Sequence, residues 1–293
     1  MIEPSDVSEE ENVMKKILTI QDISCVGKCS LTTALPVISA MGIETCVIPT
    51  AVLSNHTAFS SFTFRDLTED IPGIYEVWKK EGFRFGAVYS GYLGSAEQIG
   101  LVRRAWQEFG GKDALKIVDP AMADHGKLYT GFSESFVSEM ASLCGQADLI
   151  LPNLTEGCLM TGHPYREGGG ESYYKDLLRK LGDLGAGTVV MTGVGLQEGR
   201  LGAMTYRRSD GSFSFYDNEK LPVSFHGTGD IFASCVTGAL ALGCSAEEAA
   251  ALAVDFTLEC MKETMKDPDH SWYGVNFESA LPWLTDRVRG LEG

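Results

Sequence analysis

Short apolar runs typical of buried strands alternate along the chain with longer amphipathic stretches of helical period. The predicted strands cover residues 16–21, 45–50, 84–90, 115–119, 149–152 and 188–192, followed by a two-strand element at 202–208 and 212–217. The predicted helices cover residues 30–41, 67–81, 96–109, 134–144, 155–161, 231–242 and 246–262. This alternation predicts an α/β fold with a mostly parallel central sheet, helices on both faces, and ligands at the carboxyl ends of the strands.

Length and composition indicate one large domain. The 293 residues are 44% hydrophobic and 22% charged, which is typical of a globular chain with a substantial core. We expect an acidic tail at residues 1–14 and a single domain at residues 15–293. Residues 168–170, three consecutive glycines, are predicted to form at most a mobile loop.

The formal net charge of −16 argues against partners that are themselves polyanions. A nucleic-acid backbone or an anionic lipid surface would be repelled, because no basic patch offsets the charge. No apolar run approaches the roughly 20 residues that span a bilayer, and the acidic N-terminal segment is unlike a signal peptide. We therefore expect a cytoplasmic protein that binds small molecules, with no nucleic-acid or membrane partner.

The most informative motif is Gly227-Thr228-Gly229-Asp230 at the start of a helix rich in small residues. Glycines let main-chain N–H groups surround an anion, and a helix N-terminus adds partial positive charge. A carboxylate there would repel phosphate, but it could accept a proton from a hydroxyl that attacks the phosphate. The motif predicts phosphoryl transfer to an alcohol. Taken alone, it fits equally well a strand-to-helix turn with a capping acid.

Two acidic clusters follow predicted strands. Asp119 and Asp124 lie in one loop, where they could face a metal–phosphate group, although acidic turns at strand ends are common. Asn153 and Glu156 have the spacing of a helix capping box, which explains them fully as structural residues. Their co-occurrence with Asp119 and Asp230 favours a second interpretation, in which Glu156 holds a magnesium-bound water and Asn153 a phosphate.

Other polar residues follow the first three strands. Residues 26–30 resemble the end of a P-loop, but Asp22 and Cys29 occupy positions where that motif requires Gly and Ser or Thr, so we reject a P-loop. Asp22 is either a turn residue or a group that points into the site. Tyr92 either forms one side of a pocket for a ligand with a flat ring or covers the edge of the core.

Together these residues resemble the vitamin B6 kinases, the pyridoxal and pyridoxamine kinases of the ribokinase-like superfamily. The resemblance extends from Lys16 to about Trp283. It rests on residues 17–21, Pro49-Thr50, Ser54-Asn55-His56-Thr57, Ser90-Gly91-Tyr92, Asp119-Pro120, Pro152-Asn153 with Glu156, Val190-Met191-Thr192-Gly193 and Gly227-Thr228-Gly229-Asp230. The last motif marks the superfamily, and Ser54-Asn55-His56-Thr57 points to the B6 branch. The implied fold is a three-layer α/β/α sandwich.

The resemblance implies an ATP-dependent kinase that phosphorylates the 5′-hydroxymethyl group of a B6 vitamer, in B6 salvage. It implies Mg²⁺, possible use of a monovalent cation such as K⁺, and a homodimer. The loop at residues 123–131, with Gly126 as a hinge, would close over the site and exclude water. The resemblance implies that Asp230 is the base and that Gly227, Thr228 and Gly229 form the anion hole. It implies that the nucleotide is bound by Asp119, Asn153, Thr192 and Gly193, and the metal by Asp119, Asp124 and Glu156. The residues that it implies for binding the B6 vitamer are Asp22, Thr50, His56 and Tyr92.

Two other functions remain open from the sequence. A hydroxymethylpyrimidine kinase, or another small-alcohol kinase of the superfamily, would keep Asp230 and the anion hole and differ around Asp22, Thr50 and Tyr92. A non-catalytic ligand-binding protein could keep the fold, but it would gain nothing from an aspartate aimed at phosphate.

The sequence also departs from the B6 kinase pattern at several positions around the ring and nucleotide sites. Asp22 stands where the family usually has Ser. This chain also has Val52 where Gln is usual, Phe59 where Tyr is usual, Ala123 where Gly is usual and Leu151 where Thr is common. An ionised carboxylate only accepts hydrogen bonds, so Asp22 would favour an ammonium group or a protonated ring nitrogen. This suggests that pyridoxamine is a good substrate.

Overall fold

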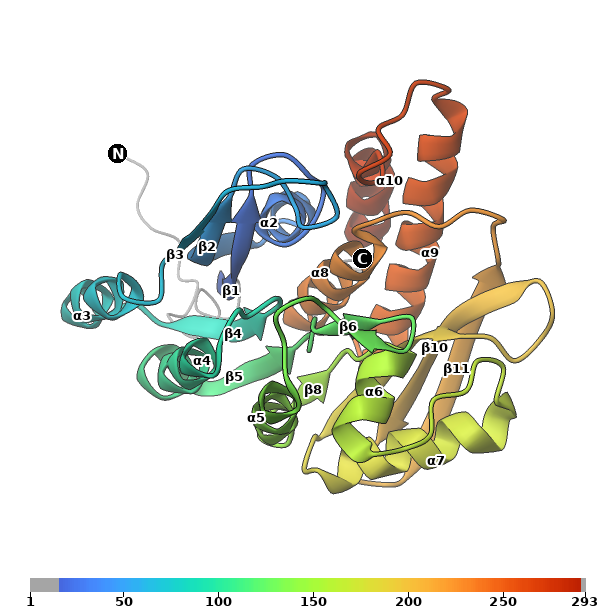
Figure 1. Ribbon diagram of the computed structural model, residues 1–293, viewed down its shortest axis with the longest axis horizontal. Helices are drawn as coiled ribbons and strands as arrows, with labels where there is room; N and C mark the ends of the chain where they lie inside the picture. The colour runs from blue at the N-terminus through green and yellow to red at the C-terminus, as the bar shows by residue number, and fades with distance from the viewer. Residues whose placement is uncertain (1–15, 291–293) are drawn as a thin grey trace.

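A computed structural model describes residues 16–290 and has the predicted three-layer architecture (Figure 1). The acidic tail predicted at residues 1–14 lies outside the described residues. The strands are β1 (Lys16–Ser24), β2 (Glu44–Leu53), β3 (Phe64–Asp66), β4 (Phe85–Ser90), β5 (Gly110–Val118), β6 (Ala123–Asp124), β7 (Lys127–Leu128), β8 (Leu149–Ile150), β9 (Thr188–Val194), β10 (Arg200–Arg207) and β11 (Ser212–Glu219). The helices are α2 (Leu31–Ala40), α3 (Ile71–Glu81), α4 (Ala96–Phe109), α5 (Glu134–Cys144), α6 (Leu154–Thr161), α7 (Gly170–Asp183), α8 (Thr228–Ala241), α9 (Ala246–Lys266) and α10 (Phe277–Arg289).

The main sheet has nine strands in the order β11-β10-β9-β8-β5-β4-β1-β2-β3. The six strands from β9 to β2 are parallel, while β3, β10 and β11 pair antiparallel at the two edges. The chain moves outward from β1 to β2 and then returns to the opposite side of β1 with β4. The strand order therefore reverses between β1 and β4, and ligands of open α/β sheets bind outside the carboxyl ends of strands at such a point.

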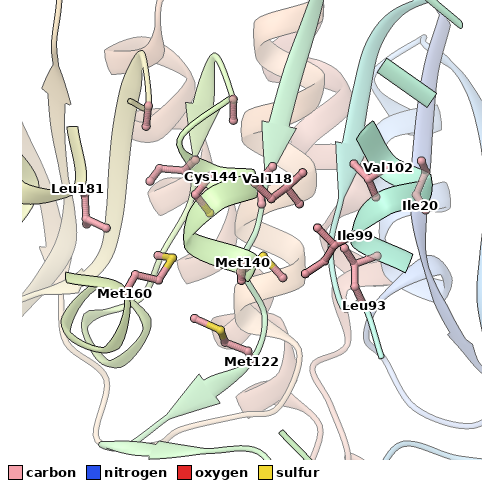
Figure 2. Packing of buried hydrophobic residues seen from close by; sticks show 14 of the residues in the cluster. Ile20, Leu93, Ile99, Val102, Val118, Met122, Met140, Cys144, Met160 and Leu181 are labelled. Atoms are coloured by element: carbon pink, nitrogen blue, oxygen red, sulfur yellow. The ribbon is translucent and has the colours of Figure 1, made fainter. Parts of the chain in front are cut away.

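Two apolar clusters hold helices against opposite faces of the sheet. One cluster packs α3 to α7 against one face, and the other packs α2, α8, α9 and α10 against the other face. Figure 2 shows part of the first cluster, which includes the flexible side chains of Met122, Met140 and Met160. All six residues of β4 are buried, as expected for a central strand covered on both faces.

The predicted loop at residues 168–170 is wrong in part, because α7 begins at Gly170. The buried residues of α7 follow the helical period; they are Tyr174, Leu177, Leu178 and Leu181. The glycines of residues 168–170 lie at the N-terminal end of this helix, where glycine lowers helix stability less than in the interior. The C-terminal helix α10 also has no counterpart among the predicted elements. Among residues 16–290, none of the helices combines the length and apolar character needed to cross a bilayer.

Candidate functional site

The N-terminus of α8 presents main-chain N–H groups to the carboxyl edge of the sheet. Gly227 precedes the helix with a φ of 81°, a left-handed conformation that suits glycine. It has no side chain to accept the first N–H groups, and the Thr228 hydroxyl instead donates to the Phe225 carbonyl (3.3 Å). The first turn of a 14-residue helix is thus left to bind an anion or water.

Asp230 lies in that first turn and is half-buried. Its Oδ1 accepts a hydrogen bond from the main-chain N–H of Ser30 at 2.9 Å. Burial raises the pKa of Asp230 to about 7, an effect that the Ser30 hydrogen bond opposes and the charge of Asp22 reinforces. A carboxylate with a pKa near neutrality is suited to accept a proton at physiological pH.

This pKa predicts an acid limb in the pH–rate profile. Asp230 must be deprotonated to act as a base, so kcat/KM for the alcohol should fall about tenfold per pH unit below pH 7. Initial rates at saturating nucleotide, measured with two different vitamers, would separate this limb from titration of the substrates. A profile that is flat between pH 5.5 and 7.5 for both vitamers would contradict the assignment.

Asp119 directly follows β5, and Glu156 lies in the first turn of α6, which follows the neighbouring parallel strand β8. Burial and the charges of Glu156 and Asp230 raise the pKa of Asp119 well above its usual range. Burial also raises the pKa of Glu156 to about 8, even though main-chain N–H groups donate to its carboxylate. The structure therefore brings together three of the acids that the sequence predicted at this edge.

Asn153 and Glu156 form the predicted capping box of α6, so the structural interpretation of their spacing is confirmed. Their side chains also hold the beginning of the β6–β7 hairpin. Glu156 Oε1 accepts from the N–H of Met122 (3.1 Å), and Asn153 Nδ2 donates to the Ala123 carbonyl (2.8 Å). The segment predicted to close over the site thus starts from residues that are hydrogen-bonded to Glu156 and Asn153. The phosphate role of Asn153 and the metal role of Glu156 remain predictions.

Asp124 differs from these buried acids because it is exposed, although its charge helps to raise the pKa of Glu156. Its exposed carboxylate accepts a hydrogen bond from the main-chain N–H of the adjacent residue His125 (2.8 Å). Within residues 16–290, no three His, Cys, Asp or Glu side chains group closely enough to form a metal site by themselves. Asp119 and Glu156 nevertheless suit Mg²⁺, which usually binds one or two carboxylates and completes its shell with water and substrate phosphates.

Asp22 lies beside Asp230 at a distortion of β1. The register between β1 and β2 shifts between Gln21 and Ile23, and such bulges often redirect side chains near active sites. The Asp22 carboxyl is buried, which raises its pKa, while the hydroxyls of Ser24 and Ser30 lower it by hydrogen bonding. Its charge in turn raises the pKa of the half-buried Tyr92, after the larger effect of burial, so the two side chains line the same region.

Thr50 lies on β2 beside the distorted part of β1, and His56 lies in the loop after β2. Thr50 is buried, and its hydroxyl has no hydrogen-bond partner among the described residues, which leaves it for a ligand. His56 differs, because Nε2 lies 3.0 Å from the Tyr273 carbonyl and Nδ1 accepts from the Ala58 N–H at 3.2 Å. With both nitrogens engaged, His56 can contact a vitamer only through its ring carbons.

Thr192 and Gly193 lie at the end of β9, the strand next to β8. The Thr192 N–H donates to the Pro152 carbonyl at 3.2 Å, which holds this strand end beside Asn153. Gly193 is exposed with a φ of 73° and open space where a side chain would be. The position suits a nucleotide, and this role remains a prediction.

Several buried polar atoms near the ring region were not predicted as functional. Gln21 Oε1, the Tyr89 hydroxyl and the Ser90 hydroxyl have no hydrogen-bond partners in the part of the chain that the structure describes. Buried polar groups are usually paired, so these atoms are candidates to bind a ligand or ordered water. The signal in the sequence is the polar side chains of Gln21 and Ser90 within two central strands.

Comparisons with known proteins relate this chain to kinases of small molecules. A model of the phosphomethylpyrimidine kinase family matches residues 31–272. The "Pyridoxal kinase PdxY" of Actinobacillus pleuropneumoniae is 30% identical over 153 residues, 49% of this chain and 52% of that protein. The chain thus spans about half the length of the first curated relatives it matches.

Two solved structures match over nearly their whole length. A putative phosphomethylpyrimidine kinase from Bacteroides thetaiotaomicron, crystallised with pyridoxal, is 37% identical with a TM-score of 0.87 and covers 92% of this chain and 95% of its own. Pyridoxal kinase from Lactobacillus plantarum is 30% identical with a TM-score of 0.84 and covers 94% of this chain and 98% of its own. The relatives named pyridoxal kinases confirm the predicted resemblance to the B6 kinases of the ribokinase-like superfamily, and the chain belongs to the phosphomethylpyrimidine kinase family.

Proposed function

We propose that this protein is an ATP-dependent kinase that phosphorylates the 5′-hydroxymethyl group of a B6 vitamer. The observation that carries the proposal is the Asp230 carboxylate, whose pKa is raised to about 7, in the first turn of a helix whose N-terminal N–H groups have no side-chain cap. The pyridoxal kinase from L. plantarum, which matches nearly the whole chain, supports the choice of substrate. B6 salvage is the corresponding role.

In this proposal Asp230 accepts the proton of the CH₂OH group as its oxygen forms a bond to the γ-phosphorus. The bond between that phosphorus and the bridging oxygen of ATP breaks, and ADP leaves. The N–H groups around Gly227, Thr228 and Gly229 stabilise negative charge on the transferred group. Bound Mg²⁺, held by Asp119 and Glu156, would neutralise phosphate charge.

A hydroxymethylpyrimidine kinase is the second candidate, favoured by the name of the matching family. ATP consumption should be measured with pyridoxal, pyridoxamine, pyridoxine and hydroxymethylpyrimidine, each with and without Mg²⁺. We expect turnover of B6 vitamers that depends on Mg²⁺. A kcat/KM that is higher for hydroxymethylpyrimidine than for every vitamer would replace the first proposal by the second.

Three finer properties remain predictions from the sequence and its family resemblance: the homodimer, use of a monovalent cation such as K⁺, and the cytoplasmic location. Light scattering coupled to gel filtration measures the first. Replacing K⁺ by a bulky organic cation in the assay measures the second.

We also propose that Asp22 makes pyridoxamine a favoured vitamer. Asp22 is a buried carboxylate with a raised pKa, and no lysine or arginine is among the groups that lower this pKa. An aminomethyl ammonium or a protonated ring nitrogen would supply the missing opposite charge through a charge-assisted hydrogen bond. A bound cation would also keep Asp22 ionised.

Replacing Asp22 by Ser should lower the ratio of kcat/KM for pyridoxamine to that for pyridoxal about tenfold, since hydrogen bonds to charged groups contribute about 1.5–3 kcal/mol. The exposed acid Asp113 on β5 gives a matched control, and Asp113→Ser should leave the ratio unchanged. An unchanged ratio in Asp22→Ser would remove Asp22 from vitamer selection.

A further inference from the structure

The turn Gly27-Lys28-Cys29-Ser30, which resembles part of a P-loop, does not present its lysine to the site. Lys28 Nζ donates to Asn276 Oδ1 (2.9 Å) and forms an ion pair with Glu278 Oε2 (2.8 Å). The lysine side chain is only 18% exposed, and a Cβ added to Gly274 would lie 2.6 Å from Lys28 Cβ. The side chain is thus packed against the C-terminal segment that leads into α10.

The other end of this turn contacts the catalytic region. Ser30 donates its N–H to Asp230, and its φ of 49° is a left-handed value rarely adopted by serine. The Lys28 carbonyl lies directly against Gly227, where an added Cβ would come within 1.9 Å of the oxygen. Strained backbone of this kind persists only where neighbouring contacts hold it.

The C-terminal partner of Lys28 is itself fixed to another helix. The Asn276 N–H donates to Thr264 Oγ1 (2.7 Å), and Asn276 Nδ2 donates to Asp267 Oδ2 (3.1 Å), both at the end of α9. A continuous series of contacts therefore runs from α9 through Asn276 and Lys28 to Ser30 and the base. Contiguous networks of this kind can hold a reacting group in place from a distance.

We propose that Lys28 is a positioning residue for the base Asp230, acting through the strained turn and the Ser30 N–H. The inference rests on the proposed kinase function, because it assigns a role to Asp230 in catalysis. Lys28 touches neither the base nor the predicted phosphate groups. Its contribution is to fix where Ser30 holds the carboxylate, and small errors in the position of a reacting group slow catalysis strongly.

The first test is the kinetics of Lys28→Met, assayed with the best alcohol substrate of the wild type. We expect kcat to fall about tenfold while KM for MgATP stays within about twofold, because the nucleotide residues are untouched. Lys28→Arg, which can keep both partners, should recover most of kcat. The matched control is Lys262→Met, which breaks the Lys262–Glu219 ion pair (2.7 Å) between α9 and β11 and should leave both constants unchanged. An unchanged kcat in Lys28→Met would overturn the inference.

The second test does not depend on activity. Hydrogen–deuterium exchange should become faster in Lys28→Met in two peptides distant in sequence, residues 24–31 and 225–231, and should stay unchanged there in Lys262→Met. If Lys28→Met does not fold, Glu278→Gln keeps the Asn276 contact and should show the same pattern more weakly. Unchanged exchange at residues 225–231 in both variants would overturn the inference. A wild type that phosphorylates no alcohol would instead defeat the proposed function, and the exchange comparison would still decide whether Lys28 holds the turn.

Discussion

Asp230→Asn should lower kcat by about 10²–10⁴, the usual contribution of a general base. The substitution is nearly isosteric, and the amide oxygen of Asn can still accept the Ser30 N–H that now binds Asp230 Oδ1. What it removes is the ability to take up a proton. Because the helix N–H groups and the predicted nucleotide residues are unchanged, MgATP should bind with nearly the same affinity in a calorimetric titration.

Asp255→Asn is the matched control for this experiment. Asp255 is a helical carboxylate of α9 that accepts hydrogen bonds from the Tyr216 hydroxyl and Asn218 Nδ2. Loss of its charge alters the surface of the protein but not the proposed reaction, so its kcat should match the wild type. If Asp230→Asn keeps kcat within a few-fold of Asp255→Asn, Asp230 is not the base.

The sequence was sufficient to predict the elements whose apolar positions follow one clear period. The bounds of α4 and α5 agree with the predicted 96–109 and 134–144 because each helix starts after a serine and ends before a glycine. The strand-end acids could be predicted to converge for a topological reason, since carboxyl ends of parallel strands share one edge of the sheet. The short strands β3, β6 and β7, of two or three residues, carry too little pattern to be recognised.

Details that depend on tertiary contacts could not be predicted. The β1 distortion at Asp22 arises from the register against β2, and no local signal marks it. The engagement of His56 Nε2 depends on the Tyr273 carbonyl, 217 residues later in the chain. Lys28 likewise has its partners about 250 residues away, and the partial local resemblance of its turn to a P-loop gives no sign of them.

Gly227→Ala should combine a large loss of activity with a moderate loss of stability. Gly227 has a φ of 81°, and an added Cβ would lie 1.9 Å from the Lys28 carbonyl oxygen, a main-chain atom that can retreat only if the whole turn moves. Moving the turn shifts the Ser30 N–H, and moving residue 227 shifts the N–H groups of the anion hole. Loss of one such donor lowers kcat about 10²–10³-fold in other enzymes, and we expect at least that effect.

Gly82→Ala separates the collision at Gly227 from the cost of a left-handed alanine. Gly82 has a φ of 75° at the end of α3, and nothing lies within 4 Å of an added Cβ. This control should lose about 1–2 kcal/mol of unfolding free energy and no activity, whereas Gly227→Ala should lose more of both, as measured by denaturant unfolding and steady-state kinetics. If the two variants are equally stable and equally active, the main chain around residue 227 does not hold the transferred phosphate. That result would argue against the assignment of the anion hole, and the role of Asp230 would still be decided by the Asp230→Asn substitution.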